Sequence, residues 1–256
     1  KMKKYKNRTN KQINIIDGLI MKRKICLFIL PLFVAIILSG LSGCSTFDYY
    51  FITNFSGINI SCGNVYITKG LGHNLEIDAP DFIKKYIIVK VINDVLTIYY
   101  DNSFLSVDKE YISKINIYIM TPYLDKIYLS SYVYCEMKGF NNLSNLTIDI
   151  SNYSKLIANF NVKNLNVSCS NYSELKFSGN ANNLNAKLRN YSTLYAINLI
   201  VLYGYLSLEN YCKANVKIIV DLKAEILNYS ELRNYAIPKC QINIDQNSIF
   251  YQGTII

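Results

Sequence analysis

The chain has 256 residues, 51% hydrophobic and 18% charged, so it is too apolar and too weakly charged for a disordered protein. A single His excludes any site that needs two imidazoles. The net charge of +9 is concentrated in residues 1–43, which carry +8, while residues 44–256 carry only +1, so a basic nucleic-acid-binding surface is not indicated.

The N-terminal segment has the pattern of a secretory signal. Residues 1–20 are interpreted as an upstream extension or a misassigned start, and Met21 as the start of the signal. Residues 22–24 (Lys-Arg-Lys) precede a mostly apolar run over residues 25–41. A charged start, an apolar stretch and small residues before a cleavage point define a removable signal peptide, predicted here over residues 21–43.

Residues 41–44, Leu-Ser-Gly-Cys, resemble the lipobox of bacterial lipoproteins. The resemblance implies that Cys44 is diacylated and becomes the mature N-terminus, with residues 44–53 as a lipidated tether. Several acyl chains anchor a protein durably, where one chain is marginal. The resemblance also implies that Ser45 directs the protein to the outer membrane. The alternative is an uncleaved transmembrane helix over residues 25–41, at the lower length limit for crossing a bilayer.

Residues 56–123 predict strands that lack a strict period. The predicted strands are residues 58–67, 87–92, 95–100 and 115–120. Asn93 and Asp94 fit the two-residue turn of a β-hairpin between the second and third of these strands. Residues 101–112 are polar and predict a solvated loop.

The second half of the chain is an internal repeat whose signature is Asn-Tyr-Ser or Asn-Tyr-Cys. The copies occupy residues 152–154, 171–173, 190–192, 210–212 and 228–230, with successive Tyr residues 19, 19, 20 and 18 positions apart. Before each copy, apolar residues alternate with polar ones, as in Leu146, Ile148 and Ile150, which is typical of a half-buried strand. Each unit is interpreted as a strand, a tight turn, a short strand and a loop.

One unit of about 19 residues cannot bury its apolar face alone, so successive units are expected to stack in register as a β-solenoid. Charged residues at equivalent positions support this register, because neighbouring copies carry opposite signs. The pairs are Lys155 with Glu174, Arg189 with Glu209, and Lys213 with Glu231. The predicted fold is therefore all-β, with a solenoid of 19-residue coils preceded by an irregular β-hairpin region, in one domain over residues 54–256.

The turn residues form two predicted columns. Asn tolerates the left-handed backbone of a tight turn, and stacked Asn amides can bond to one another, which predicts a structural ladder. Its members are Asn152, Asn171, Asn190, Asn210 and Asn228. The second column is a candidate binding strip for sugar rings or a protein ligand, or alternatively a stack that only stabilises the turns. Its members are Tyr153, Tyr172, Tyr191, Tyr211 and Tyr229, with Tyr132 in a degenerate copy.

With this repeat, the chain resembles the DUF2807 family, whose domain is called the putative autotransporter adhesin head, or GIN, domain. The resemblance covers about residues 54–253 and includes residues 55–60 (Phe-Ser-Gly-Ile-Asn-Ile), 63–70 and 95–98. In the family repeat the turn is close to Leu-Ser-Gly-Ala-Ser-Lys-Leu, and here Asn replaces Gly and Tyr replaces Ala, as in residues 150–156. The resemblance implies a right-handed β-helix-like fold in a cell-envelope protein.

No residue pattern indicates catalysis, a cofactor or a metal site. His73 lacks a repeated partner and is expected to be a solvent-exposed turn residue. The other cysteines of the body lack Cys-x-x-Cys spacing and are expected to be free thiols; they are Cys62, Cys135, Cys169, Cys212 and Cys240.

The sequence therefore predicts a non-catalytic envelope lipoprotein with an adhesin-like or ligand-binding solenoid. It is anchored to the membrane through Cys44 and takes a protein or carbohydrate ligand. Two alternatives are a structural lipoprotein that self-associates through its ends and a polysaccharide-acting β-helix enzyme. The enzyme would need clustered carboxylates, whereas the outward acidic residues are scattered.

Overall fold

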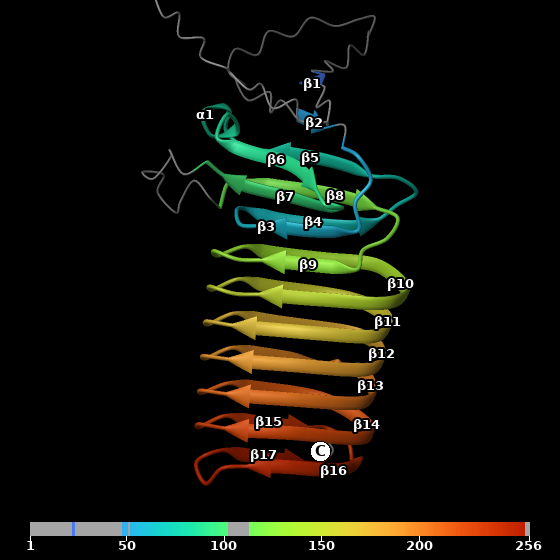
Figure 1. Cartoon of the computed structure of the whole chain (residues 1–256), viewed down its shortest axis with the longest axis vertical. Coiled ribbons are helices and arrows are strands. Elements are labelled where there is room, and N and C mark those ends of the chain that lie inside the picture. Colours follow the sequence, from blue (N-terminus) through green and yellow to red (C-terminus); the bar gives the residue numbers. More distant parts are fainter. Residues whose placement is uncertain (1–21, 24–47, 51, 102–112, 254–256) are drawn as a thin grey trace, which may run out of the picture.

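The computed structural model describes residues 22–23, 48–50, 52–101 and 113–253, whose strands stack along one long axis (Figure 1). Cys44, most of the predicted signal peptide and most of the loop predicted over residues 101–112 lie outside the described residues. Within the described part of the chain, no helix combines the length and apolar character needed to cross a membrane.

The first half of the chain forms the upper coils in an order that differs from the sequence. Its strands are β1 (Lys22–Arg23), β2 (Asp48–Tyr50), β3 (Gly57–Ile60), β4 (Asn64–Lys69), β5 (Asn74–Asp78), β6 (Ile87–Ile92), β7 (Val95–Tyr100), β8 (Asn116–Thr121) and β9 (Lys126–Leu129). Strand β3 lies between β7 and β9, and β4 lies between β8 and β10, with all four pairings parallel. The chain therefore places β3 and β4 inside the stack first and then returns with β7 and β8 to build the level above them.

Antiparallel strands complete this end of the stack. Strand β5 pairs with β8 and β2, β2 also pairs with β1, and β6 and β7 form the predicted hairpin. Asn93 and Asp94 have φ values of 49° and 65°, as a type I′ turn requires. The strand predicted over residues 58–67 is instead two strands, separated by a turn at Gly63 with φ of +77°. The short helix α1 (Asp81–Lys84) lies at the end, with Ile83 fully buried, so this end of the core is covered (Figure 1).

The repeats form a solenoid, as predicted. Its coils are β10 (Tyr134–Ile150), β11 (Lys155–Ser170), β12 (Glu174–Arg189), β13 (Thr193–Glu209) and β14 (Lys213–Leu227). Neighbouring coils pair in parallel with equivalent residues in register, so that Leu156 faces Leu175 and Leu175 faces Leu194. The prediction of a short strand and a loop after each turn was wrong, because each coil is one strand of 15 to 17 residues that bends around the far edge. The neighbouring coils supply hydrogen-bond partners along most of the bend, with local register shifts such as those between Ala196 and Ile200 and between Val201 and Tyr203.

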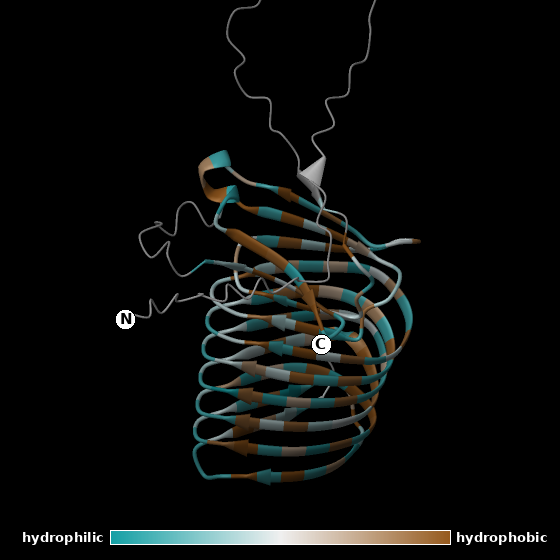
Figure 2. Cartoon of the chain, turned by 45° about the horizontal axis from the view of Figure 1, so that its top comes forward, coloured by the Kyte–Doolittle hydropathy of each residue, from teal (hydrophilic) through white to brown (hydrophobic). Residues whose placement is uncertain are grey.

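The core is a continuous apolar column between two sheet faces. Hydrophilic and hydrophobic residues alternate along the coils (Figure 2). The hydrophobic ones are the buried positions, and one buried cluster extends from Tyr50 to Leu232. At the bend, the rings of Phe160 and Phe177 pack edge to face at 5.3 Å. Gly179 follows in the same bend with φ of +113°, and a Cβ there would lie 1.9 Å from the Phe160 carbonyl oxygen. Glycine is therefore required for neighbouring coils to approach at this point.

The last coil comprises β15 (Glu231–Asn234), β16 (Lys239–Ile244) and β17 (Ile249–Gln252). Strand β16 pairs with β14 of the preceding coil, β17 pairs with β15, and among the described residues nothing pairs with the outer edges of β16 and β17. The end carries exposed apolar side chains, including Ile237 at 78% and Ile249 at 45% exposure. The two ends of the solenoid therefore differ, one covered by α1 and the hairpin and the other open in the described structure.

Candidate functional site

The Asn-Tyr turns stack into one column along a narrow edge of the solenoid. Both turn residues adopt positive φ in every copy, for example 54° at Asn190 and 62° at Tyr191. From Tyr132 to Tyr211, each Tyr amide of the column donates a hydrogen bond to the Asn carbonyl of the next coil, as from Tyr191 to Asn210 at 2.9 Å. The turns are therefore joined through their backbones as well as their side chains.

The Asn side chains form the predicted ladder. From Asn171 onward, each Nδ2 donates to the Oδ1 of the Asn one coil earlier. The bonds run from Asn171 to Asn152, Asn190 to Asn171 and Asn210 to Asn190, each at 3.0 Å, and from Asn228 to Asn210 at 2.9 Å. Each inner amide uses one donor and its acceptor oxygen in this arrangement, so the ladder orients every turn relative to its neighbours.

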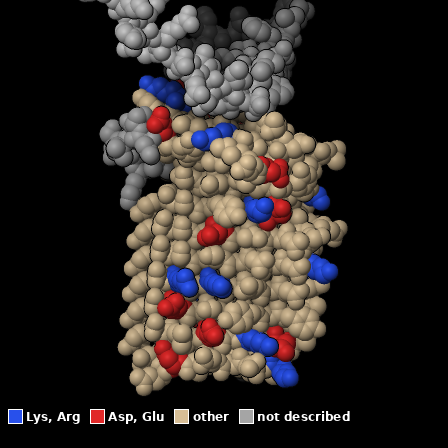
Figure 3. All heavy atoms as spheres, in the orientation of Figure 1, with Lys and Arg blue, Asp and Glu red and all other residues tan. Residues whose placement is uncertain are grey.

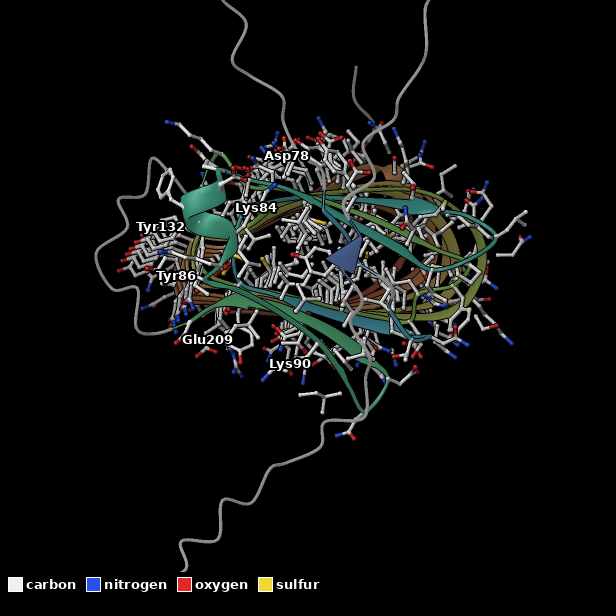
Figure 4. All side chains as sticks on the ribbon, turned by 90° about the horizontal axis from the view of Figure 1, so that it is seen from above. Asp78, Lys84, Tyr86, Lys90, Tyr132 and Glu209 are labelled. Carbon is white, nitrogen blue, oxygen red and sulfur yellow. The ribbon has the colours of Figure 1, made fainter. Side chains whose placement is uncertain are left out.

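The Tyr side chains form a continuous stack of six rings, which starts at Tyr132 (Figure 4). Successive centroids are 4.8 to 5.0 Å apart, and neighbouring ring planes differ by only 1° to 5°. The six side chains are 46% to 57% exposed, yet each inner ring has a neighbour on both faces. The strip therefore presents ring edges and phenol oxygens to solvent, and its inner ring faces cannot receive a sugar ring.

The third turn residue points inward and explains the Ser in the repeat. The hydroxyls of Ser154 and Ser173 are buried, and the Ser173 hydroxyl accepts a hydrogen bond from the Ser154 amide at 3.3 Å. Cys212 takes this place in one coil and donates from Sγ to the Glu209 carbonyl at 3.1 Å. A buried polar atom needs such partners, so this column is a structural part of the turn.

The predicted register of charges is confirmed. Lys155 Nζ lies 2.9 Å from Glu174 Oε1, and Arg189 Nε lies 3.5 Å from Glu209 Oε2. Lys213 faces Glu231 in the strand register, although Glu231 forms its ion pair with Arg233 at 3.3 Å. All these groups are partly exposed, so the pairs fix the register more than they add stability.

A groove that the sequence did not predict crosses one broad face of the solenoid. It has a volume of about 710 Å³ and lies over the second halves of β10 to β14. Two rows of Asn, with Tyr203 and Tyr205 from β13, form much of its lining. This broad face is turned toward the viewer in Figure 3, where charges of both signs are scattered over it. The sequence does contain a signal for this groove at two outward positions of the repeat. There, Asn183 and Asn185 are followed one coil later by Tyr203 and Tyr205.

His73 is not the exposed turn residue that the sequence predicted. It is half-buried, with its ring 4.6 Å from that of Phe55 and 5.7 Å from that of Tyr123. Its Nδ1 lies 3.3 Å from the Thr121 hydroxyl oxygen. Burial lowers the pKa of His73, and Asp94 opposes this change. The prediction failed because the upper strands return beside the turn, and the contacts describe packing rather than a nucleophile and its base.

The five body cysteines are free thiols, as expected, and four of them are buried. Burial raises the pKa of both Cys62 and Cys169 from 9.0 to about 12. A thiolate is the nucleophile and the metal ligand, so protonated buried thiols are inert in both roles. Cys62, Cys135 and Cys169 therefore act as small apolar side chains of the core.

Comparison with known proteins identifies the family. The sequence profile described as "Putative auto-transporter adhesin, head GIN domain" (DUF2807) matches residues 54–238. The chain belongs to this family. No match was found among curated proteins.

Solved structures of low sequence identity share the fold of this GIN domain. A putative adhesin from Bacteroides fragilis has a TM-score of 0.73 at 19% identity, covering 82% of this chain and 96% of that one. A putative adhesin from Parabacteroides merdae has a TM-score of 0.59 at 12% identity, with coverages of 81% and 95%. A structure from Parabacteroides distasonis named a putative lipid binding protein also has a TM-score of 0.59, at 11% identity, with coverages of 80% and 95%.

The positive φ of the Tyr residues in the turn column predicts that replacement by Ala is more destabilising than replacement by Gly. Tyr191 combines a left-handed backbone, costly for a residue with a Cβ, with ring stacking on both faces. Tyr191→Ala and Tyr191→Gly both remove the stacking, but only Gly relieves the backbone cost. We expect the Ala variant to have the lower free energy of unfolding, by about 1 kcal/mol, in denaturant titrations.

Tyr195 provides the matched control, because it is exposed on the same coil and lies outside the set of residues with positive φ. At Tyr195 the order should reverse, since Gly in a strand interior is less stable than Ala. Equal effects of Ala and Gly at Tyr191 would show that the left-handed backbone does not limit the choice of residue there.

The buried thiols predict a loss of stability at alkaline pH. In the unfolded chain the Cys62 thiol ionises near 9.0, whereas in the folded chain it stays protonated to about 12. Between these values only the unfolded state releases the proton, so the free energy of unfolding falls as pH rises. Its slope should be less steep in Cys62→Ala, by up to about 1.4 kcal/mol per pH unit, in denaturant titrations between pH 9 and 11. Identical slopes for Cys62→Ala and the parent would contradict the assignment.

Proposed function

We propose that this chain is a non-catalytic lipoprotein of the bacterial cell envelope whose solenoid is an adhesin-like, ligand-binding module. The observation that carries the proposal is the architecture of a GIN domain, in which register-locked coils display ordered rows of polar and aromatic side chains. Such rows form an extended recognition surface without moving parts, as repeat proteins commonly use.

The anchor in this proposal is Cys44, with the outer membrane as the destination. Strand β2 begins at Asp48, so a fully extended connection from Cys44 reaches at most about 14 Å. This short connection would hold the end with α1 beside the membrane. The open end of the solenoid would then point away from the membrane, where a ligand has access.

The absence of catalysis in this proposal rests on how the acidic groups are distributed. Within the described residues, no three His, Cys, Asp or Glu side chains cluster closely enough to hold a metal ion. The carboxylates of Glu174 and Glu209 are each engaged by a cation of the neighbouring coil. A polysaccharide-cleaving site would need convergent carboxylates, so binding fits these faces better.

Self-association through the open end is the second candidate function, and it is supported by the last coil. Exposed Ile237, Ile249 and Tyr251 lie beside the unpaired edges of β16 and β17 among the described residues. Open edges and apolar side chains favour pairing with a second copy. A solution that stays monomeric in sedimentation at high concentration would refute this candidate.

Lipid anchoring is tested by substitution of Cys44 in a bacterium that processes lipoproteins. We expect the parent chain to incorporate labelled palmitate and to fractionate with membranes. Cys44→Ala should lose the label at least about tenfold, because a lipid-modification site cannot be replaced by a side chain without a thiol. Gel fluorography and membrane fractionation measure both outcomes.

The matched control is Cys26→Ala, which removes a thiol from the apolar part of the predicted signal and should keep the label. Equal labelling of Cys44→Ala and the parent would overturn the lipoprotein proposal. Digestion of the body by a non-penetrating protease on intact cells would support an adhesin, and protection until lysis would favour a periplasmic binding protein.

A further inference from the structure

The groove on the broad face differs chemically from the Tyr strip on the edge. Its lining combines amide side chains from three successive coils with two aromatic side chains from β13. From Asn145 to Asp221 it spans five coils, or about 19 Å at the usual spacing of strands. Its volume of about 710 Å³ lies within the range of small-molecule and cofactor sites.

One row of amides in the groove is internally bonded and leaves its ends available. Asn164 Nδ2 donates to Asn145 Oδ1 at 2.9 Å, and Asn183 Nδ2 donates to Asn164 Oδ1 at 2.8 Å. The row stops at Asn183 because Tyr203 occupies the next coil. The Asn183 Oδ1 therefore remains an acceptor beside an aromatic ring.

The second row consists of Asn166 and Asn185, which face each other across neighbouring coils. Both are exposed, and neither forms a side-chain hydrogen bond with any residue that the structure describes. The contrast with the bonded ladders of this protein is clear, since Asn171 and Asn190 use their amides within the column. Each amide of the second row offers two donors and an acceptor to a ligand.

Tyr203 and Tyr205 offer the ring faces that the Tyr strip conceals. They alternate with Gly204 on β13, so both side chains point to the same broad face. They are 50% and 38% exposed, and no other aromatic ring of the described chain stacks on them. Burial and the neighbouring Glu225 raise the pKa of Tyr205, so its hydroxyl stays protonated at neutral pH.

The charges of the groove favour a neutral ligand. Asp221 and Lys223 follow the two Tyr residues on the next coil, and their charges cancel. The rest of the lining is uncharged. Nucleic acids need a clear excess of cations, which the groove does not supply.

The backbone of this face is closed to an added strand. Strand β12 pairs with β11 and β13, and β13 pairs with β12 and β14, so the main-chain groups are used within the solenoid. A peptide that binds by strand addition needs an open edge. Recognition in this groove must therefore use side chains alone.

The geometry points to a binding site for a neutral oligosaccharide in this groove, an inference that rests on the proposed ligand-binding function. The apolar C–H face of a sugar ring packs against Tyr203 and Tyr205, and its hydroxyls bond to Asn166, Asn185 and the free oxygen of Asn183. Tyr supplies a large contact area at low entropic cost, and Asn supplies adaptable hydrogen bonds. The length of the groove selects a chain of sugars over a single ring.

The test uses the full-length protein, purified in detergent, on an array of oligosaccharides. The neutral members are built from glucose, mannose and N-acetylglucosamine, and the acidic members are sialylated or sulfated. We expect neutral oligosaccharides to bind and the double variant Tyr203→Ala, Tyr205→Ala to weaken binding at least about tenfold, as for truncated aromatic contacts at the centre of a site. Asn185→Ala should weaken binding about threefold to tenfold.

Matched controls separate the groove from the fold. Tyr195→Ala removes an exposed Tyr from the first half of β13, on the other side of the bend from the groove, and should leave affinity unchanged. Tyr203→Phe keeps the ring face and should retain most of the affinity. Circular dichroism and the unfolding midpoint should show that each variant keeps the fold.

Four outcomes would overturn the inference. Unchanged binding by the double variant would move the site away from the groove, and binding only to acidic glycans would refute the neutral class. If no oligosaccharide binds while the protein still adheres to cells, the sugar ligand is refuted and the proposed function stands. Loss of adhesion as well would count against both.

Discussion

In-register stacking of equivalent residues is the constraint on which the rest of this structure depends. Because each side chain lies directly beside its counterpart in the neighbouring coil, a residue type that can bond to itself becomes a column along the solenoid. Asn does so through its amide, as from Asn190 to Asn171, and Tyr does so through its ring, as in Tyr172 and Tyr191. Residues that repel themselves must alternate, which accounts for Lys155 above Glu174. The same rule fills the interior with a continuous apolar column.

In the turn column, the free-energy cost of a left-handed backbone at each Tyr is offset by stacking of its ring on the neighbouring Tyr rings. A bulky side chain with positive φ is rare, because the left-handed backbone brings its Cβ close to the following carbonyl. Here Tyr adopts that conformation in every copy, and each ring gains its neighbours in the stack. In the Gly-Ala turn of the family resemblance, Gly avoids the cost at the first position, Ala keeps it at the second, and neither side chain can stack. Columns of Asn and Tyr are thus a different solution for the same turn.

The repeat made the solenoid predictable, because the spacing of Asn-Tyr and the alternating apolar residues both define the register. The same reasoning missed the bend, where paired backbone replaces the expected loop and Gly179 permits close approach. It also missed the entry of β3 between β7 and β9, since pairing between distant segments leaves no periodic mark. That return of the chain encloses His73. The groove was missed because it arises where Tyr203 and Tyr205 replace the Asn residues of the two rows. A search for repeats detects positions that are the same in every copy, and these positions differ.

The uniform coil also means that the length of this solenoid is set by the number of its coils. Neighbouring coils are separated by about 4.8 Å, so inserting or deleting one repeat changes the length by one such step and keeps every column intact. The shift from Asn183 and Asn185 to Tyr203 and Tyr205 occurs at one fixed level of the stack. Duplication of a coil on either side would raise or lower that level in discrete increments without redesigning it. Evolution could therefore tune how far a surface feature stands from the covered end independently of its chemistry.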